Sequence, residues 1–156
     1  MTAAPETVLA DYRTGLDAEL AVLADIEALA TRQRTLPHPV DADLLAALAR
    51  ERERQLAALA ALELRVLPLR QHIAANLSRF RTMPGFAGVA DRHQRASDAI
   101  VRIGRLDDES LAILRRDDAD RRAAAHNLET GEATLAAYRK VIDQSPDPAG
   151  FFAERG

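Results

Sequence analysis

The length, composition and charge of this 156-residue chain favour one domain built from helices and exclude several classes of function. Ala and Leu supply 53 residues, whereas aromatic residues make up only 4% of the chain, which suits a thin seam between helices better than a thick globular core. The 21 basic residues nearly balance the 24 acidic ones, which argues against a nucleic-acid partner, and the absence of cysteine excludes disulfides and thiolate metal sites.

A first amphipathic helix is predicted over residues 5–34. Pro5 suits the first turn of a helix, and Glu6 lies near the positive end of the helix dipole. Apolar residues then recur with the seven-residue period of a coiled coil. One series consists of Leu9, Leu16 and Leu23, and the positions between them are filled by Tyr12, Leu20 and Ile26.

A second helix is predicted over residues 41–80. Pro37 and Pro39 end the first helix because they lack backbone N–H donors, and Asp41 then offers an N-cap. Pro68 interrupts the second helix and predicts a bend within one helix rather than two helices. Its two seven-residue series are Leu45, Arg52, Leu59, Val66, Ile73 and Phe80, and Leu48, Leu62 and Leu69.

Arg52 is the exception in the first of these series, because it places a charge where the seam should be apolar. It belongs to the run Arg-Glu-Arg-Glu-Arg at residues 50–54, whose alternating charges are typical of a solvated helix surface. Two explanations stay open for Arg52: the bundle is open at this level, or the side chain extends its charge to water.

A third helix is predicted over residues 92–142. Residues 81–90 contain Pro84, Gly85 and Gly88 and should form a loop whose apolar side chains cover the end of the bundle. Asp91 and Gln94 then resemble a capping box. The apolar stripe of this helix consists of Ile103, Leu114, Leu128, Leu135, Tyr138 and Ile142, widened near its start by Ile100, Leu106 and Leu111.

This stripe is interrupted between Arg115 and Arg122, where no large apolar residue occurs. Asp–Arg pairs four residues apart are expected to keep the helix intact there, each contributing about 0.2–0.5 kcal/mol. Gly104 and Gly131 are candidate hinges, because a glycine inside a helix costs about 1 kcal/mol relative to alanine.

Together these elements predict an all-α protein, in which an elongated antiparallel helical hairpin and a long third helix form a coiled-coil-like three-helix bundle. Residues 1–142 would be the single domain. Residues 143–156 would be a non-helical C-terminal tail, which contains the apolar pair Phe151 and Phe152.

The sequence offers no catalytic or metal-binding pattern, so we expect neither enzymatic activity nor a cofactor. A metal site in a helical bundle normally uses paired Glu-x-x-His motifs, and none occurs here. The serine residues before the tail have an ordinary helical context, and residues 84–88 match no phosphate-binding loop. Scattered histidines are expected to face solvent or to be incidental: His38, His72, His93 and His126.

The apolar residues at the end of the third helix have two interpretations, and the sequence leaves both open. They pack on the first helix as core, or they form an amphipathic surface that binds a partner. The second interpretation gives a set of candidate client-binding residues: Leu128, Leu135, Tyr138, Val141, Ile142, Phe151 and Phe152.

Residues 135–139 (Leu-Ala-Ala-Tyr-Arg) and 150–156 (Gly-Phe-Phe-Ala-Glu-Arg-Gly), which close an arrangement of three long helices, resemble the flagellar export chaperones of the FlgN type. The resemblance implies a cytoplasmic chaperone that binds hook-associated junction proteins before type III secretion and delivers them to the export apparatus. It also implies that the stripe over residues 128–142 is the part that binds the client.

Other classes of protein stay open beside this one: a structural or oligomerising coiled-coil protein, another flagellar or type III secretion chaperone, and a helical-bundle metalloenzyme. No apolar stretch is long enough to span a membrane and the N-terminus has no signal-peptide pattern, so we expect a cytoplasmic protein without a membrane partner. The oligomeric state, monomer or dimer, is left open.

Overall fold

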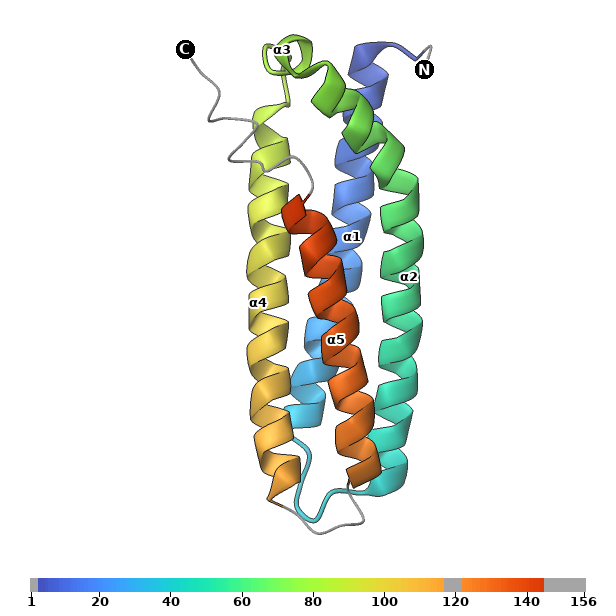
Figure 1. Ribbon diagram of the computed structural model, residues 1–156, viewed down its shortest axis with the longest axis vertical. Coiled ribbons are helices and arrows are strands. Elements are labelled where there is room, and N and C mark those ends of the chain that lie inside the picture. Colours follow the sequence, from blue (N-terminus) through green and yellow to red (C-terminus); the bar gives the residue numbers. More distant parts are fainter. Residues whose placement is uncertain (1–2, 117–121, 145–156) are drawn as a thin grey trace.

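The computed structural model describes residues 3–116 and 122–144, apart from the side chains of residues 122–124 and 127. None of these residues forms a strand, which confirms the all-α class. Four long helices run side by side in alternating directions, and the short helix α3 lies at the upper end in Figure 1. The helices are α1 (Pro5–Arg34), α2 (Ala42–Ala75), α3 (Leu77–Phe80), α4 (Ala87–Arg115) and α5 (Arg122–Gln144).

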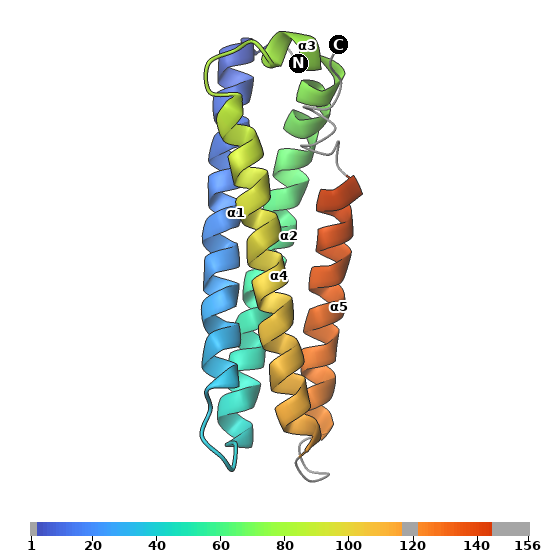
Figure 2. The same ribbon diagram turned by 90° about the vertical axis from the view of Figure 1, so that its left-hand side faces the viewer.

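The four long helices form a closed bundle in which each has two main neighbours. Helix α1 packs against α2 and α4, and helix α5 packs against the same two helices. Figure 2 shows α1 and α5 on opposite sides of the bundle, with α2 and α4 between them. Helix α5 therefore closes the side of the bundle that the first three long helices leave open.

The first two long helices follow their sequence signals. Helix α1 has the predicted bounds, and the carboxylate of Asp41 caps α2 by accepting hydrogen bonds from the backbone N–H groups of Asp43 and Leu44 (2.8 and 3.3 Å). Helix α2 continues through Pro68 as one helix, as predicted. It ends at Ala75 and not at residue 80, because Asn76 leaves the helical backbone conformation (φ −125°, ψ 34°).

The third helix predicted over residues 92–142 is replaced by two helices, α4 and α5, so the bundle has four long helices and not three. Residues 115–122 lack large apolar side chains that would pack a continuous helix against a neighbour. Folding back instead lets the apolar stripe of α5 contact α2 and α4. Helix α4 also begins earlier than predicted, at Ala87, so Asp91 and Gln94 lie inside it and do not cap it.

The core has three parts along the bundle axis, and α5 contributes to only two of them. The upper core lies near α3 and includes no described residue of α5: Val8, Leu9, Tyr12, Leu16, Val66, Ile73, Phe80, Phe86 and Val89. The middle core consists of Leu23, Ile26, Leu59, Ala96, Ala99, Ile100, Ile103, Leu135 and Tyr138. The lower core consists of Leu45, Leu111, Leu114 and Leu128. The apolar residues predicted to cover the bundle end do so, because Phe86 and Val89 are in the upper core and Met83 packs against it.

The same glycine-to-alanine substitution is expected to have opposite effects at Gly15 and Gly104. A Cβ atom at Gly15 would lie 2.6 Å from Cγ2 of Val66, whereas a Cβ atom at Gly104 would meet nothing within 4 Å. We expect Gly104→Ala to raise the free energy of unfolding by about 1 kcal/mol, since alanine favours the helix. We expect Gly15→Ala to lower it by about 1–3 kcal/mol through overpacking. Urea denaturation measures both changes in the free energy of unfolding. Equal changes in the two variants would contradict the close approach of α1 and α2.

Candidate functional site

Ionisable and phenolic side chains interrupt the apolar core where α5 covers the bundle. All four long helices contribute to this group, which we name the polar seam: Tyr12 and Glu19 of α1, Glu63 and Arg70 of α2, His93 of α4 and Tyr138 of α5. Each of these residues is buried, with no more than 8% of its surface exposed. Burying a charge is costly unless it is paired, so their mutual contacts decide what this site does.

Heptad spacing explains why these polar side chains point inward. Glu19 lies seven residues from both Tyr12 and Ile26, and His93 lies seven residues before Ile100. Residues seven apart share one face of a helix, so a polar residue in an apolar series is directed into the core. The expectation that the histidines face solvent or are incidental is therefore wrong for His93, and this spacing was the sequence signal that marked it.

Arg70 forms an ion pair with Glu63 within the polar seam. Its guanidinium forms a two-point ion pair with Glu63, with Nη2 2.9 Å from Oε2, and its Nε donates a hydrogen bond to the Tyr12 hydroxyl at 3.3 Å. Burial alone would lower the pKa of Arg70, but the hydrogen bonds that it donates to Glu63 and Tyr12 outweigh burial and raise it. Arg70 therefore stays charged and neutralises Glu63.

His93 is uncharged at neutral pH. Its Nε2 lies 2.7 Å from the hydroxyl of Tyr12. Because that hydroxyl accepts a hydrogen bond from Arg70, we assign its own proton to the bond with Nε2, which leaves the imidazole proton on Nδ1. Burial and the positive charge of Arg70 lower the pKa of His93 to about 4.

Glu19 is the carboxyl group that the seam does not neutralise. It is 2% exposed, and its Oε1 atom has no hydrogen-bond partner among the described residues. Burial and the neighbouring charge of Glu63 raise the pKa of Glu19 to about 8, so this carboxyl group is protonated at neutral pH. The hydroxyl of Tyr138 on α5 lies next to Glu19, but its geometry falls short of a hydrogen bond.

A second buried charge pair lies under α5. Arg52 of α2 forms a two-point ion pair with Asp107 of α4, and their side chains are 5% and 1% exposed. Neither sequence-based explanation of Arg52 holds, because its charge is buried and paired. Gly131 of α5 covers the pair, and a Cβ atom there would lie 3.4 Å from Nε of Arg52. A Cβ atom at that distance makes an ordinary van der Waals contact, so packing against Arg52 does not require a glycine here, and the hinge role of Gly131 stays a prediction.

The bundle is expected to lose stability as the pH rises from 6.5 to 8. Glu19 has a folded-state pKa of about 8 and an ordinary value of 4.5, so its contribution is complete below pH 4.5 and is lost as the pH rises through 8. His93 acts in the opposite direction, but only below its ordinary pKa of 6.5. Glu19 alone should remove about 1.5 kcal/mol between pH 6.5 and 8, measured by urea denaturation across that range.

Glu19→Gln is the matched variant for this pH dependence, since it keeps the shape of the side chain and removes its titration. Its stability should vary much less between pH 6.5 and 8. A second carboxyl group, Glu132 of α5, shares a hydrogen bond with Asp108 of α4, and this bond together with partial burial raises the pKa of Glu132 to about 7. Glu132→Gln should therefore remove a smaller part of the slope. An unchanged slope in Glu19→Gln would contradict a buried, protonated Glu19.

The structure places the candidate client-binding residues in different environments. Leu128, Leu135 and Tyr138 are buried in the lower and middle core, at 4%, 4% and 8% exposure. Ile142 packs partly against the middle core, and Val141 is 42% exposed. Phe151 and Phe152 lie outside the described residues. The three buried residues can touch a client only if α5 leaves the bundle.

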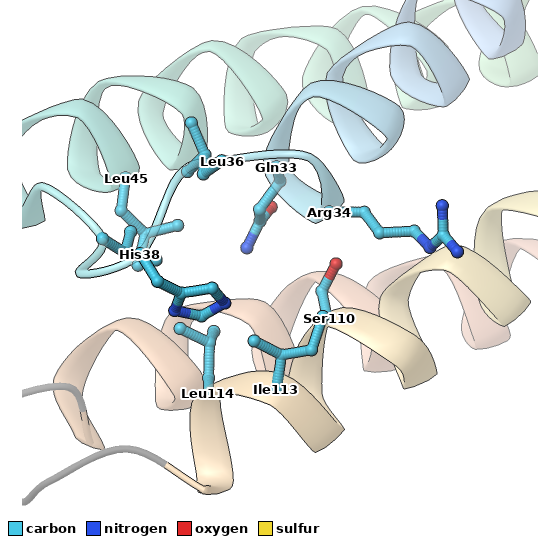
Figure 3. Close-up of a pocket in the computed structure, with 9 residues that line it drawn as sticks. Gln33, Arg34, Leu36, His38, Leu45, Ser110, Ile113 and Leu114 are labelled. Carbon is cyan, nitrogen blue, oxygen red and sulfur yellow. The ribbon is translucent and has the colours of Figure 1, made fainter.

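A pocket near the lower end of the bundle is too small for a substrate. Gln33, His38 and Ser110 project into it from three segments of the chain (Figure 3). The hydroxyl of Ser110 is buried and has no hydrogen-bond partner among the residues that the structure describes. The cavity volume of about 10 Å³ admits no more than one water molecule.

The described residues contain neither a metal-binding cluster nor a membrane-spanning helix. No group of three or more histidine, aspartate or glutamate side chains in residues 3–116 and 122–144 is arranged to hold a metal ion. No helix in these ranges is both long enough and apolar enough to cross a membrane. No protein-family model, curated protein or solved structure matches this chain.

Proposed function

We propose that this protein is an export chaperone whose helix α5 leaves the bundle and packs its apolar stripe against a helix of a secreted client. One observation carries the proposal: α5 covers the polar seam and the Arg52–Asp107 pair, while no described residue of α5 belongs to the upper core. A helix in this position is easier to release than α1, α2 or α4, each of which contributes to the upper core.

The energetics of α5 favour reversible release. Its large buried apolar side chains, among those described, are Leu128, Leu135 and Tyr138, and exposing such a side chain costs about 1.5–3 kcal/mol. Release also rehydrates Glu19 and the buried ion pair beneath Gly131, and the regained hydration offsets part of that cost. The open form is then a minor state that a client stabilises by binding.

The client that we propose is a flagellar hook-associated protein of the hook-filament junction, held in the cytoplasm before type III secretion and delivered to the export apparatus. The resemblance of residues 135–139 and 150–156 to the FlgN type supports this choice. A client whose helical ends assemble only outside the cell needs those ends covered, and an amphipathic helix can pack against them. An interface of limited area would permit release at the export apparatus.

Locking α5 onto α4 tests whether α5 must leave. Asp108 and Glu132 contact each other across these helices, and the chain contains no cysteine, so Asp108→Cys combined with Glu132→Cys supplies the only two thiols. A short, reducible reagent that reacts with two thiols would join them. We expect the locked protein to lose capture of the hook-associated client from native lysate, measured by mass spectrometry, and to regain it after reduction.

Asp108→Cys alone, treated with the same reagent, is the matched control and should capture the client normally. Undiminished capture by the locked protein would contradict release of α5. A captured client that is unrelated to flagella would contradict the identity of the client but not the release of the helix. A stable dimer without any client, measured by light scattering, would instead favour the alternative of an oligomerising coiled-coil protein.

A further inference from the structure

A small cavity lies inside the bundle where the last turn of α5 meets the polar seam. Its volume is about 10 Å³, which corresponds to about one water molecule. The residues that line it come from all four long helices: Leu16, Glu19, Arg70, His93, Ala96 and Ile142. Three of these six side chains are polar, and polar cavities of this size hold water whereas apolar ones stay dry.

Two buried polar atoms on residues that line this cavity lack partners within the protein. Oε1 of Glu19 and Nδ1 of His93 are inaccessible to solvent and make no hydrogen bond to any described residue. The two residues are 2% and 8% exposed. With the Tyr12 proton assigned to the bond with Nε2 of His93, Nδ1 carries the imidazole proton and needs an acceptor. Buried groups of this kind are rarely left unsatisfied in native proteins.

We propose that this cavity binds one ordered water molecule, which accepts a hydrogen bond from Nδ1–H of His93 and donates one to Oε1 of Glu19. A water molecule fits both the volume and the donor and acceptor requirements. A cation does not fit the donor and acceptor requirements, since Nδ1–H is a donor and the charged guanidinium of Arg70 lines the same space. The water joins α1 to α4 inside the seam, and Ile142 of α5 lines the cavity that holds it.

A crystal structure at about 1.5 Å resolution or better tests the site directly. We expect one peak of density within hydrogen-bond distance, about 2.7–3.2 Å, of both Nδ1 of His93 and Oε1 of Glu19. Nitrogen-15 NMR of the histidine ring should show Nδ1 protonated. An empty cavity, a direct bond between Glu19 and His93, or a proton on Nε2 would overturn the proposal. The proposal would also be overturned if the occupancy of this peak depended on the concentration of ammonium or potassium, because the bound species would then be a cation.

Two substitutions at one position give a matched comparison. Glu19→Gln keeps an acceptor and should keep the water, whereas Glu19→Leu removes both polar atoms and should lose it. Oxygen-17 relaxation dispersion should count one fewer long-lived internal water in Glu19→Leu than in the natural protein. If Glu19→Leu does not fold, the glutamine variant still decides, because loss of its water would contradict the site. These measurements need no client, so their outcome is independent of the proposed chaperone function.

Discussion

Replacing Arg52 with methionine is expected to lower the free energy of unfolding by about 3–5 kcal/mol, because it leaves the carboxyl group of Asp107 buried in the core without a charge partner. The Asp107 side chain is 1% exposed and forms a two-point ion pair with Arg52. Burial raises the pKa of Asp107 even with the arginine beside it. Without Arg52 the carboxyl group should take up a proton or reach water by opening the bundle. Urea denaturation at pH 7 measures the loss.

Arg54→Met is the matched control, because Arg54 lies on the same helix but pairs with Glu51 at the surface, with side-chain exposures of 68% and 35%. The free energy of unfolding of Arg54→Met should fall by less than about 1 kcal/mol. Combining Arg52→Met with Asp107→Leu should recover most of the stability, since apolar residues often replace a buried ion pair without loss. Equal losses for Arg52→Met and Arg54→Met would contradict the buried pair.

Leu135→Asp together with Tyr138→Asp is expected to detach α5 and to reduce client capture to background. Both side chains are buried in the middle core, and the new carboxylate at position 138 would face the acidic groups Glu19 and Glu63. We expect hydrogen exchange, followed by mass spectrometry, to show loss of protection in α5 while α1, α2 and α4 stay protected. Client capture fails because the apolar stripe itself is altered.

Ala136→Asp together with Ala137→Asp adds the same two charges to the exposed face of α5 and serves as the control. This variant should keep both its protection pattern and client capture. If the Leu135 and Tyr138 double variant instead loses protection in every helix, α5 is an integral part of the fold. Release of α5 during client binding would then be excluded.

The helices of the first half could be predicted from the sequence because their signals are local. The leucine series of α1, the N-cap at Asp41 and the interruption at Pro68 each act within a few residues. The break between α4 and α5 was missed for the same reason. Asp–Arg pairs over residues 117–122 favour a helix locally, whereas the gain from folding back depends on burying Leu135 and Tyr138 against distant helices.

The polar seam was missed because each of its charges, taken alone, is typical of a helix surface. Glu63 and Arg70 compensate each other on one helix, but they are buried only because α1, α4 and α5 surround them. Their seven-residue spacing places them on one face of α2 but does not show that this face points inward. Spacing alone cannot show that Glu19 faces Glu63, since that contact depends on how two helices pack. The candidate site therefore required the structure.

The upper core implies an order of assembly for the bundle. Its residues come from α1 to α4, so this end can form while α5 is still undocked. Docking of α5 would then be the last step, and it removes Glu19 from water. Since the folded-state pKa of Glu19 is about 8, the closing bundle takes up a proton at neutral pH. Closure is thus a proton-binding reaction, and acidity of the medium favours the closed form.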